Sequence, residues 1–229
     1  MKLADILFSQ GFGTRYDCVQ LAASGNVSIG GEPVDDPDRE FSTEELSFSV
    51  NGVEWPYCEH AIIALHKPEG YECSLKPSAH PSVMSLIPSP LRRRGVQPVG
   101  RLDVDTTGLL LLTDDGPLLH RLIHPKRHVS KRYVVTLKHA IVPTMIQMLE
   151  QGVVLADDPK PVAAVAARAM DSHTLELVLT SGKYHQVKRM VAACSNRVQA
   201  LHRVAFGKLE LPEGLAPGEW CWVRKEDIL

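Results

Sequence analysis

The chain has 229 residues, which is long for one average domain and short for two large ones, so we predict one main domain with a small appendage. Hydrophobic residues make up 44% of the chain and charged residues 23%, an ordinary composition for a soluble globular protein. Apolar runs such as 109–112 and 162–167 are far too short to span a membrane. Asp5, Ser9 and Gln10 interrupt the apolar core that a secretion signal needs, so we expect a cytoplasmic protein.

The formal net charge of −2 hides an uneven distribution. Residues 1–55 carry three Lys or Arg against ten Asp or Glu, a net charge of −7, which leaves +5 for the rest of the chain. Segments 116–149 and 177–209 contain basic residues and no acidic residue, and the three arginines 92–94 form a further basic cluster. Three basic segments in a chain of near-neutral total charge predict one positive surface for a phosphate backbone.

The five cysteines are odd in number and widely spread, and the sequence contains no Cys-x-x-Cys pair. We therefore expect neither a disulfide framework nor a structural zinc site. Cys58, His60, His66 and Cys73 could be taken for metal ligands, but we interpret them as strand and loop residues without a metal role.

The first 55 residues predict two short helices followed by two hairpins. Apolar residues on one face indicate a helix over 2–10, and Thr14 is placed to cap a second helix over 15–23. Gly30-Gly31 and Asn51-Gly52 each lie between short strand-like runs, which is typical of tight hairpin turns.

Two helices followed by hairpins, with Arg15 opening the second helix and Gly-x-Val before the first turn, resemble the S4-type RNA-binding module. The resemblance implies that residues 1–56 form a domain that contacts RNA, with Arg15 among the contacts. Its net charge is unusual for such a module, but most of the acidic residues fall in 35–45, a loop that we expect to lie away from RNA. The alternative is a small domain that only packs against or orients the main one.

Residues 55–59 are predicted to form a linker, followed by a strand over 61–66 and a turn over 67–70. The proline-rich segment 76–98 is predicted to be mostly loop, with a short helix over 82–87.

The segment that organises the rest is a polar turn leading into the apolar run 109–112. A short apolar run between turn signals indicates a buried strand. Arg101, Asp103 and Asp105 lie on the loop before this strand, and loops held by a rigid element are where chemistry tends to be placed.

In the remaining chain, strands outnumber helices and neighbouring strands look like hairpins. This pattern favours antiparallel strands over a regular strand–helix repeat. We predict helices over 117–123, 143–151 and 184–194, and strands over 129–137, 162–169, 174–180, 197–201, 205–211 and 220–223. The fold class that follows is α+β, with a mixed, mainly antiparallel sheet from residue 60 onward.

Four segments in order resemble the motifs of one family. They are Leu65-x-Lys67-Pro-x-Gly70, Gly100-Arg-Leu-Asp103 with Asp105-Thr-Thr-Gly-Leu-Leu, Lys131-Arg-Tyr133, and Gly182-Lys-Tyr-His-Gln-Val-Lys188-Arg-Met190. Together they resemble the pseudouridine synthases, in the branch that modifies ribosomal RNA. The last motif and Leu201-His202-Arg203 are most similar to the small-subunit members of that branch. The resemblance spans residues 60–206 and implies a catalytic domain over 60–229.

The resemblance implies that the chain converts uridine to pseudouridine, detaching the base at N1 and rejoining it through C5 without metal or cofactor. Asp103 matches the family's nucleophile, Lys188 its basic partner, and Tyr133 the ring that stacks on the freed uracil. A buried carboxylate tends to be protonated unless a cation offsets its desolvation, so Lys188 is expected to keep Asp103 ionised. Many relatives have Arg at this position, and Lys lacks the bidentate fork. For Tyr133, the alternative is an ordinary core tyrosine.

Six basic residues are expected to contact RNA: Arg101, Arg15, Lys67, Lys131, Lys183 and Arg189. Arg101 would hold the phosphate of the flipped nucleotide or fill its gap, since the target base must leave its stack. For Lys67, a turn residue with a solvated amine is the alternative. The expected substrate is one uridine of small-subunit (16S) ribosomal RNA, free or in a small-subunit assembly particle, and the protein is expected to be a monomer without a nucleotide cofactor.

Asp105 is expected to form a hydrogen-bonded turn with the threonines after it, and Asp114 and Asp115 an ordinary turn. His185 is expected to lie behind the reacting groups. A rival interpretation is a metal-dependent phosphohydrolase or nuclease using these acids and Asp103, but a strand of nine residues at ~3.3 Å per residue would separate them by roughly 30 Å. The sequence is also compatible with the same chemistry on large-subunit rRNA or tRNA, and with an RNA-binding assembly factor without catalysis.

Overall fold

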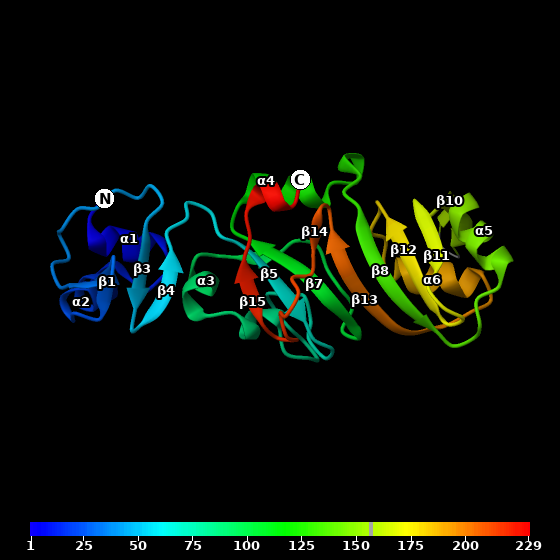
Figure 1. The fold of residues 1–229 in the computed structure, drawn as a ribbon, viewed down its shortest axis with the longest axis horizontal. Helices are drawn as coiled ribbons and strands as arrows, with labels where there is room; N and C mark the ends of the chain where they lie inside the picture. Colours follow the sequence, from blue (N-terminus) through cyan, green and yellow to red (C-terminus); the bar gives the residue numbers. More distant parts are fainter. Residues whose placement is uncertain (156–157) are drawn as a thin grey trace. The chain divides into compact units, whose positions relative to one another are not determined.

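The computed structural model describes residues 1–155 and 158–229 (Figure 1). The chain divides into two compact units. The first comprises Met1–Ala61, Ile87–Gln97 and Thr113–Asp115, and the second Ile62–Leu86, Pro98–Leu112 and Gly116–Leu229. Among the described helices, none has the length and apolar character needed to cross a membrane.

The first unit contains two N-terminal helices and a four-stranded sheet. The elements are α1 (Leu3–Ser9), α2 (Arg15–Ala23), β1 (Val27–Ile29), β2 (Glu32–Val34), β3 (Ser47–Val50) and β4 (Val53–Pro56). The strand order is β2-β1-β3-β4, with antiparallel neighbours. Thr14 caps α2 as predicted: its hydroxyl accepts the Asp17 N–H at 3.2 Å, and the Asp17 carboxylate accepts the Thr14 N–H at 2.8 Å. The predicted helices and hairpins are confirmed.

The predicted linker over 55–59 is wrong. Trp55 lies in β4, is 5% exposed, and meets the ring of Phe12 edge-on, with ring centroids 5.2 Å apart. The carbonyl of Cys58 accepts hydrogen bonds from Gln10 at 3.1 Å and Arg94 at 3.0 Å. Apolar burial and these bonds make the segment part of the unit's core.

A buried ion pair holds together the three segments of this unit. Arg94, whose side chain is 4% exposed, donates its Nε–H to Asp114 Oδ2 at 2.8 Å. Asp114 Oδ1 also accepts the Ala61 N–H at 2.7 Å. Arg94 follows α3 (Ser89–Arg93), a helix that the sequence analysis assigned to loop because of its prolines. Proline is tolerated there because the first helical turn leaves N–H groups unbonded anyway. Asp114 therefore has a structural role, as expected for an acid outside the catalytic set.

We predict that Asp114→Ala lowers the free energy of unfolding by about 3 kcal/mol, because it leaves the buried Arg94 guanidinium unpaired. Urea denaturation measures the change. The matched control is Asp38→Ala, which breaks the exposed Lys2–Asp38 pair and is expected to cost less than about 1 kcal/mol. Equal losses for the two variants would contradict the structural role of Asp114.

The second unit is built on a mixed sheet of order β11-β12-β8-β13-β7-β5-β15, with β14 pairing β13 and β6 pairing β7. Its strands are β5 (Ile62–Lys67), β6 (Gln97–Pro98), β7 (Thr106–Thr113), β8 (Lys131–Leu137), β11 (Ala166–Ala169), β12 (Thr174–Leu179), β13 (Val198–Phe206), β14 (Leu209–Glu210) and β15 (Trp220–Trp222). Strand β13 runs parallel to β7 and antiparallel to β8. The predicted α+β class with a mixed, mainly antiparallel sheet is confirmed.

Short helices and a separate strand pair accompany this sheet. They are α4 (Gly116–Ile123), α5 (Pro143–Gln151), α6 (Gln186–Ala193), η1 (Val83–Leu86), η2 (Pro125–Arg127), η3 (Lys225–Asp227), and the pair β9 (Val153–Leu155) and β10 (Asp158–Val162). Figure 1 shows α5 and α6 at the same end of the sheet as β11 and β12, where α5 contacts β11 and α6 contacts β9.

Glycine is required where β7 meets β13. Gly108 has φ of +104° and is in register with Arg203, and a Cβ at this position would lie 2.3 Å from the Arg203 carbonyl oxygen. A side chain would force the two strands apart, so Gly108 fixes their close approach. The apolar run after it fills the core, with Leu109 and Leu111 packed against Ala64, Val99 and Phe206.

Three predicted strands differ from the structure. The predicted strand 162–169 is divided between the end of β10 and β11, which belong to different sheets. Predicted strands 197–201 and 205–211 are joined: β13 runs through both, with a register shift at Arg203/Ala205, and β14 follows. Such a bulge keeps a strand continuous across a polar interruption.

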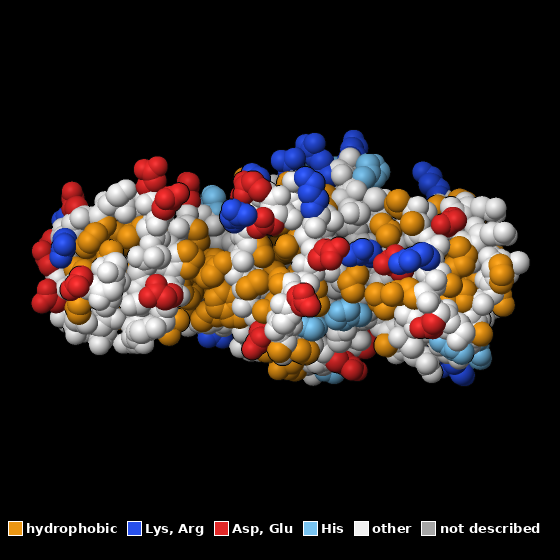
Figure 2. All heavy atoms as spheres, in the orientation of Figure 1, with side chains coloured by type: hydrophobic (Ala, Val, Ile, Leu, Met, Phe, Trp, Pro, Cys, Tyr) orange, Lys and Arg blue, Asp and Glu red, His pale blue; other side chains and the backbone are white. Residues whose placement is uncertain are grey.

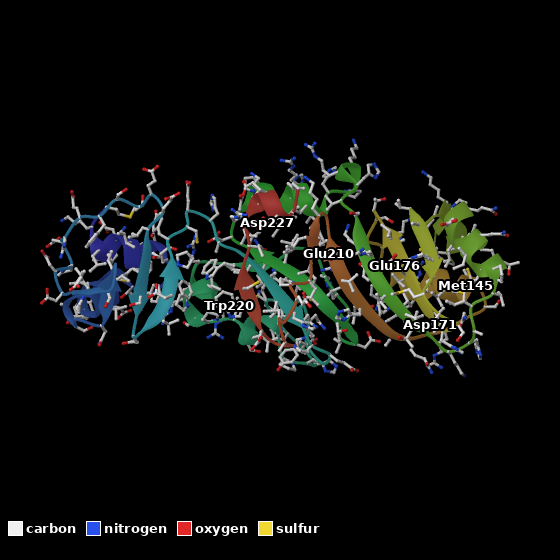
Figure 3. The ribbon with its side chains drawn as sticks, in the orientation of Figure 1. Met145, Asp171, Glu176, Glu210, Trp220 and Asp227 are labelled. Atoms are coloured by element: carbon white, nitrogen blue, oxygen red, sulfur yellow. The ribbon has the colours of Figure 1, made fainter. Side chains whose placement is uncertain are left out.

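The outer face of the sheet carries a small ion-pair network. Arg132 lies 2.6 Å from Glu210 and 4.0 Å from Glu176, and Arg168 lies 3.1 Å from Glu176 (the two glutamates are labelled in Figure 3). Side chains alternate across a strand, so Lys131 and Tyr133, the neighbours of Arg132, point to the opposite face. That opposite face is where the candidate site lies.

Candidate active site

The loop before β7 is held by a buried lysine. Lys67 is fully buried, and its Nζ donates hydrogen bonds to the carbonyls of Pro68, Val104 and Thr106 at 3.0, 3.2 and 2.8 Å. Desolvation is the largest effect on this amine and lowers its pKa, against the opposing influence of nearby acids. The expected contact between Lys67 and RNA phosphate is therefore wrong: the ammonium is inaccessible and is engaged by the backbone that carries Asp103.

We predict that Lys67→Met lowers the catalytic rate and the free energy of unfolding, the latter by about 2 kcal/mol, because three backbone carbonyls lose their shared donor. RNA affinity is expected to stay within about twofold, since no phosphate contact is removed. A filter-binding titration beside an unfolding curve checks both. A variant with native stability and weakened RNA binding would contradict the buried role.

Asp103, Asp105 and Lys188 form one ionic cluster. Lys188 Nζ lies 3.0 Å from Asp103 Oδ2, 2.6 Å from Asp105 Oδ1 and 2.9 Å from Asp105 Oδ2. Asp103 and Lys188 are each 27% exposed, whereas Asp105 is 60% exposed. The structure thus brings together the predicted nucleophile and its predicted partner, which come from the loop before β7 and from α6.

The ionic cluster favours the charged forms of Asp105 and Lys188. Partial burial alone would raise the pKa of Asp105, but its hydrogen bonds and charge interaction with Lys188 outweigh that effect and hold the pKa below its usual range. Likewise, burial would lower the pKa of Lys188, but both carboxylates together raise it. Asp103 therefore lies beside a permanent cation at neutral pH.

Sequence reasoning missed the contact of Asp105 with Lys188, having expected a simple turn. The sequence signal for this contact was that Asp105 lies two residues after Asp103 on a tight loop. His185 lies next to the predicted nucleophile, with Nε2 3.4 Å from Asp103 Oδ1. It has a left-handed backbone with φ of +48° and stacks on Tyr184, with centroids 3.7 Å apart.

Asp103 and Lys188 line a pocket of about 320 Å³, a size suited to a small planar group. Tyr133 lies in its wall, 8% exposed and opposite Arg203 in the β8–β13 register. Apolar side chains close the rest of the wall: Leu102, Leu122, Val129, Leu179, Val187, Leu201 and Phe206. An aromatic ring beside apolar walls and a charged cluster at one side can hold a flat, polar-edged base.

A buried glutamine orders the turn that leads into α6. Gln186 is 5% exposed, and its Oε1 accepts the Lys183 N–H at 2.8 Å while its Nε2 donates to Ser181 Oγ at 2.8 Å. The 181–185 turn is thereby fixed at the edge of the pocket, one turn before Lys188.

The predicted RNA-binding residues fall into separate surroundings. Arg101 and Lys183 are exposed and line the pocket. Arg189 donates to the Tyr184 carbonyl at 3.0 Å, and Arg15, in the first unit, pairs with Asp5 at 3.0 Å. Lys131 is half-buried inside the pocket.

A cationic surface lies over α4 and η2. Its basic residues are Arg121, Lys126 and Arg127, with His120, His124 and His128 among them. Figure 2 shows Lys and Arg side chains gathered where Figure 1 draws these two elements. His124 and Pro125 also line the pocket, so the cationic surface continues to the pocket's edge. Such a surface suits a polyanionic substrate of which one unit enters the pocket.

The chain is similar to known proteins over most of its length. A family model described as RNA pseudouridylate synthase matches residues 61–193. The uncharacterized RNA pseudouridine synthase YtzG of Bacillus subtilis strain 168 is 36% identical over 231 residues, covering 100% of this chain and 97% of the relative. The ribosomal small subunit pseudouridine synthase A of Pasteurella multocida is 34% identical, covering 94% of this chain and 92% of the relative. A crystal structure of a pseudouridylate synthase matches with a TM-score of 0.70 at 32% identity, covering 99% of this chain and 97% of that one.

Proposed function

We infer that this chain, which belongs to the RNA pseudouridylate synthase family, isomerises one uridine of small-subunit ribosomal RNA with Asp103 as the nucleophile. The enzyme class is that of an isomerase acting on RNA. The observation that carries the role of Asp103 is its 3.0 Å contact with Lys188 at a pocket lined by Tyr133.

The reaction is balanced within the substrate. The N1–C1′ bond of uridine breaks, a C5–C1′ bond forms, and a proton leaves C5 while N1 gains one, so no redox cofactor or added group is required. Asp103 acts as the nucleophile on the nucleotide and is released when the base rejoins the ribose. The attack requires an ionised carboxylate, and Lys188 places a positive charge 3.0 Å from Asp103 Oδ2.

The pocket residues have distinct roles in this proposal. The ring of Tyr133 stacks on the detached uracil and keeps it in the pocket while it rotates. Arg101, exposed beside Asp103, contacts the phosphate of the flipped nucleotide or fills the gap it leaves. Arg15, Lys183 and Arg189 contribute further contacts with RNA, free or within a small-subunit assembly particle.

Small-subunit rRNA is favoured as the substrate because relatives that match most of the chain are named ribosomal small subunit pseudouridine synthase A. Mapping pseudouridines in rRNA from cells that lack the protein tests this directly. Carbodiimide-blocked primer extension is expected to show one site lost from small-subunit rRNA, restored by the wild type and not by Asp103→Asn. A site lost instead from large-subunit rRNA or tRNA would overturn the substrate but keep the chemistry, and no change in any RNA would favour a binding function.

A further inference from the structure

Two buried polar atoms of residues that line the pocket have no hydrogen-bond partner in the described part of the chain. Arg203 is 2% exposed; its Nε donates to the Leu109 carbonyl at 2.8 Å, but its Nη2 has no hydrogen-bond partner among the described residues. Thr106 Oγ1 is also buried without a partner in the described part of the chain, and both residues line the pocket. Buried polar groups are nearly always satisfied in native proteins, so two orphans at one cavity indicate a ligand that completes them.

A second cation lies near Arg203. Lys131 Nζ donates to the Val129 carbonyl at 2.9 Å and lies 5.2 Å from the centroid of the Phe206 ring, and Arg203 Cζ is 5.3 Å from the same ring. Burial, followed by the charge of Arg203, lowers the pKa of Lys131 to about 8. Within the described residues, neither cation has a salt bridge to a carboxylate, unlike Lys188. The pocket floor therefore carries positive charge that the protein itself does not neutralise.

The burial of the pocket residues indicates which part of a nucleotide can contact Lys131 and Arg203. Arg203 and Phe206 are 2% and 1% exposed, whereas Arg101 and Lys183 are exposed where the pocket opens. A phosphodiester is tied to the chain on both sides and stays at the opening. The flipped base projects from the backbone and is the part that can reach the floor.

We propose that Lys131 and Arg203, assisted by the Thr106 hydroxyl, bind the two carbonyl oxygens of the target uracil and stabilise the negative charge that the ring acquires when it is detached. This inference rests on the proposed function, because it assumes that uridine is isomerised in this pocket. When the N1–C1′ bond breaks, its electron pair stays with the uracil and is shared by O2 and O4. When C5 bonds to C1′, the ring is neutral again, and the proton lost from C5 is replaced by one on N1.

Two donors suit the geometry of the rearrangement. Turning the ring about its N3–C6 axis exchanges N1 with C5 and, at the same time, O2 with O4. Donors placed for both carbonyls before the turn are thus placed for both afterwards. Fixed donors aimed at developing charge in a water-poor site typically contribute about 10²–10³ in rate each.

The first test removes the deep charge. Arg203→Met is expected to lower the single-turnover rate on a small-subunit rRNA transcript by about 100-fold while the Kd for RNA stays within twofold, and Arg203→Lys is expected to recover part of the rate. The matched comparison is Lys183→Met at the pocket opening, which is expected to raise Kd and reduce its salt dependence. Weakened binding and a reduced salt slope for Arg203→Met would show a phosphate contact and overturn the proposal.

The second test does not depend on removing a buried side chain. In the free enzyme, protonated Lys131 is the active form, so kcat/KM of the wild type is expected to fall as the pH rises above about 8. The other charged or titratable groups that line this pocket are the same in the wild type and in Lys131→Arg; they are Arg101, Asp103, His124, Tyr133, Lys183, His185, Lys188 and Arg203. Lys131→Arg is therefore expected to retain kcat/KM to higher pH.

The outcomes separate the inference from the function on which it rests. An alkaline limb that is unchanged in Lys131→Arg, in an active enzyme, would overturn the role of Lys131 and leave the proposed function intact. A wild-type protein that forms no pseudouridine in any RNA tested would overturn the proposed function and this inference with it.

Discussion

Replacing Asp103 by Asn will reduce the rate of pseudouridine formation by about 10⁴-fold or more, because a neutral amide cannot serve as the nucleophile. The change keeps the size of the side chain and removes the charge that Lys188 contacts at 3.0 Å. A single-turnover assay with enzyme in excess over a small-subunit rRNA transcript measures the chemical step free of product release.

Asp105→Asn is the matched control for this prediction. Asp105 lies on the same loop and also contacts Lys188, at 2.6 Å, but its side chain is 60% exposed and it does not line the pocket. We expect Asp105→Asn to lose much less activity than Asp103→Asn, and both variants to bind RNA about as tightly as the wild type. Equal losses would mean that the charge of the cluster, rather than a reaction at Asp103, determines the rate.

Lys188→Met is expected to lower the rate by about 100- to 1000-fold, because two carboxylates then face each other at the pocket without their shared cation. Losing Lys188 also removes the interactions that hold the pKa of Asp105 below its usual range. The sign follows: without Lys188 the pKa of the Asp105 carboxyl rises, so this carboxyl takes up its proton at a higher pH in the variant than in the wild type. A single-turnover assay measures the loss of rate, and an NMR titration of the Asp105 carboxyl in the two proteins measures the pKa change.

Lys188→Arg tests whether the site requires only a positive charge or the position of the lysine amine. A guanidinium restores the cation and can contact two carboxylates through its fork, so we expect most of the activity to return. If Lys188→Arg were as inactive as Lys188→Met, the exact position of the lysine amine, rather than its charge, would be the requirement.

The elements that sequence patterns predicted well depend on local signals. The Thr14 cap, the Gly and Asn-Gly turns and the proline at the start of α5 each act within a few residues, and the predicted boundaries of α2 and α5 agree with the structure. The buried strand β7 follows from its apolar run between polar turns. The motif resemblance pointed to Asp103 and Lys188, which are 85 positions apart in the sequence and 3.0 Å apart in the structure.

The surroundings of three residues were not predicted from the sequence, because they depend on contacts between distant parts of the chain. Lys67 looked like a solvated turn residue, and only the packing of β5 against the 103–106 loop buries its amine. Arg203 lies within a run that looked like a break between strands, whereas the bulge in β13 carries it into the pocket. Asp105 was interpreted as a turn residue because its contact with Lys188 comes from α6, far along the chain.

The division of the chain was predicted as two contiguous domains, 1–56 and 60–229, and these ranges stay a prediction. The compact units found in the structure are discontinuous, since Ile87–Gln97 and Thr113–Asp115 group with Met1–Ala61. Arg94 and Asp114 explain why: a buried ion pair and bonds to Gln10 and Ala61 join these segments. No local sequence pattern indicates that such distant segments group together.

Tritium release from small-subunit rRNA labelled at C5 of uridine, with purified wild-type protein and Asp103→Asn, tests whether Asp103 is the nucleophile. Isomerisation must expel the C5 hydrogen of the target uridine. We expect the wild type to release one equivalent of tritium per RNA, and a folded, RNA-binding Asp103→Asn variant to release none above background. Release by the variant at the wild-type rate would contradict the assignment of Asp103 as the nucleophile.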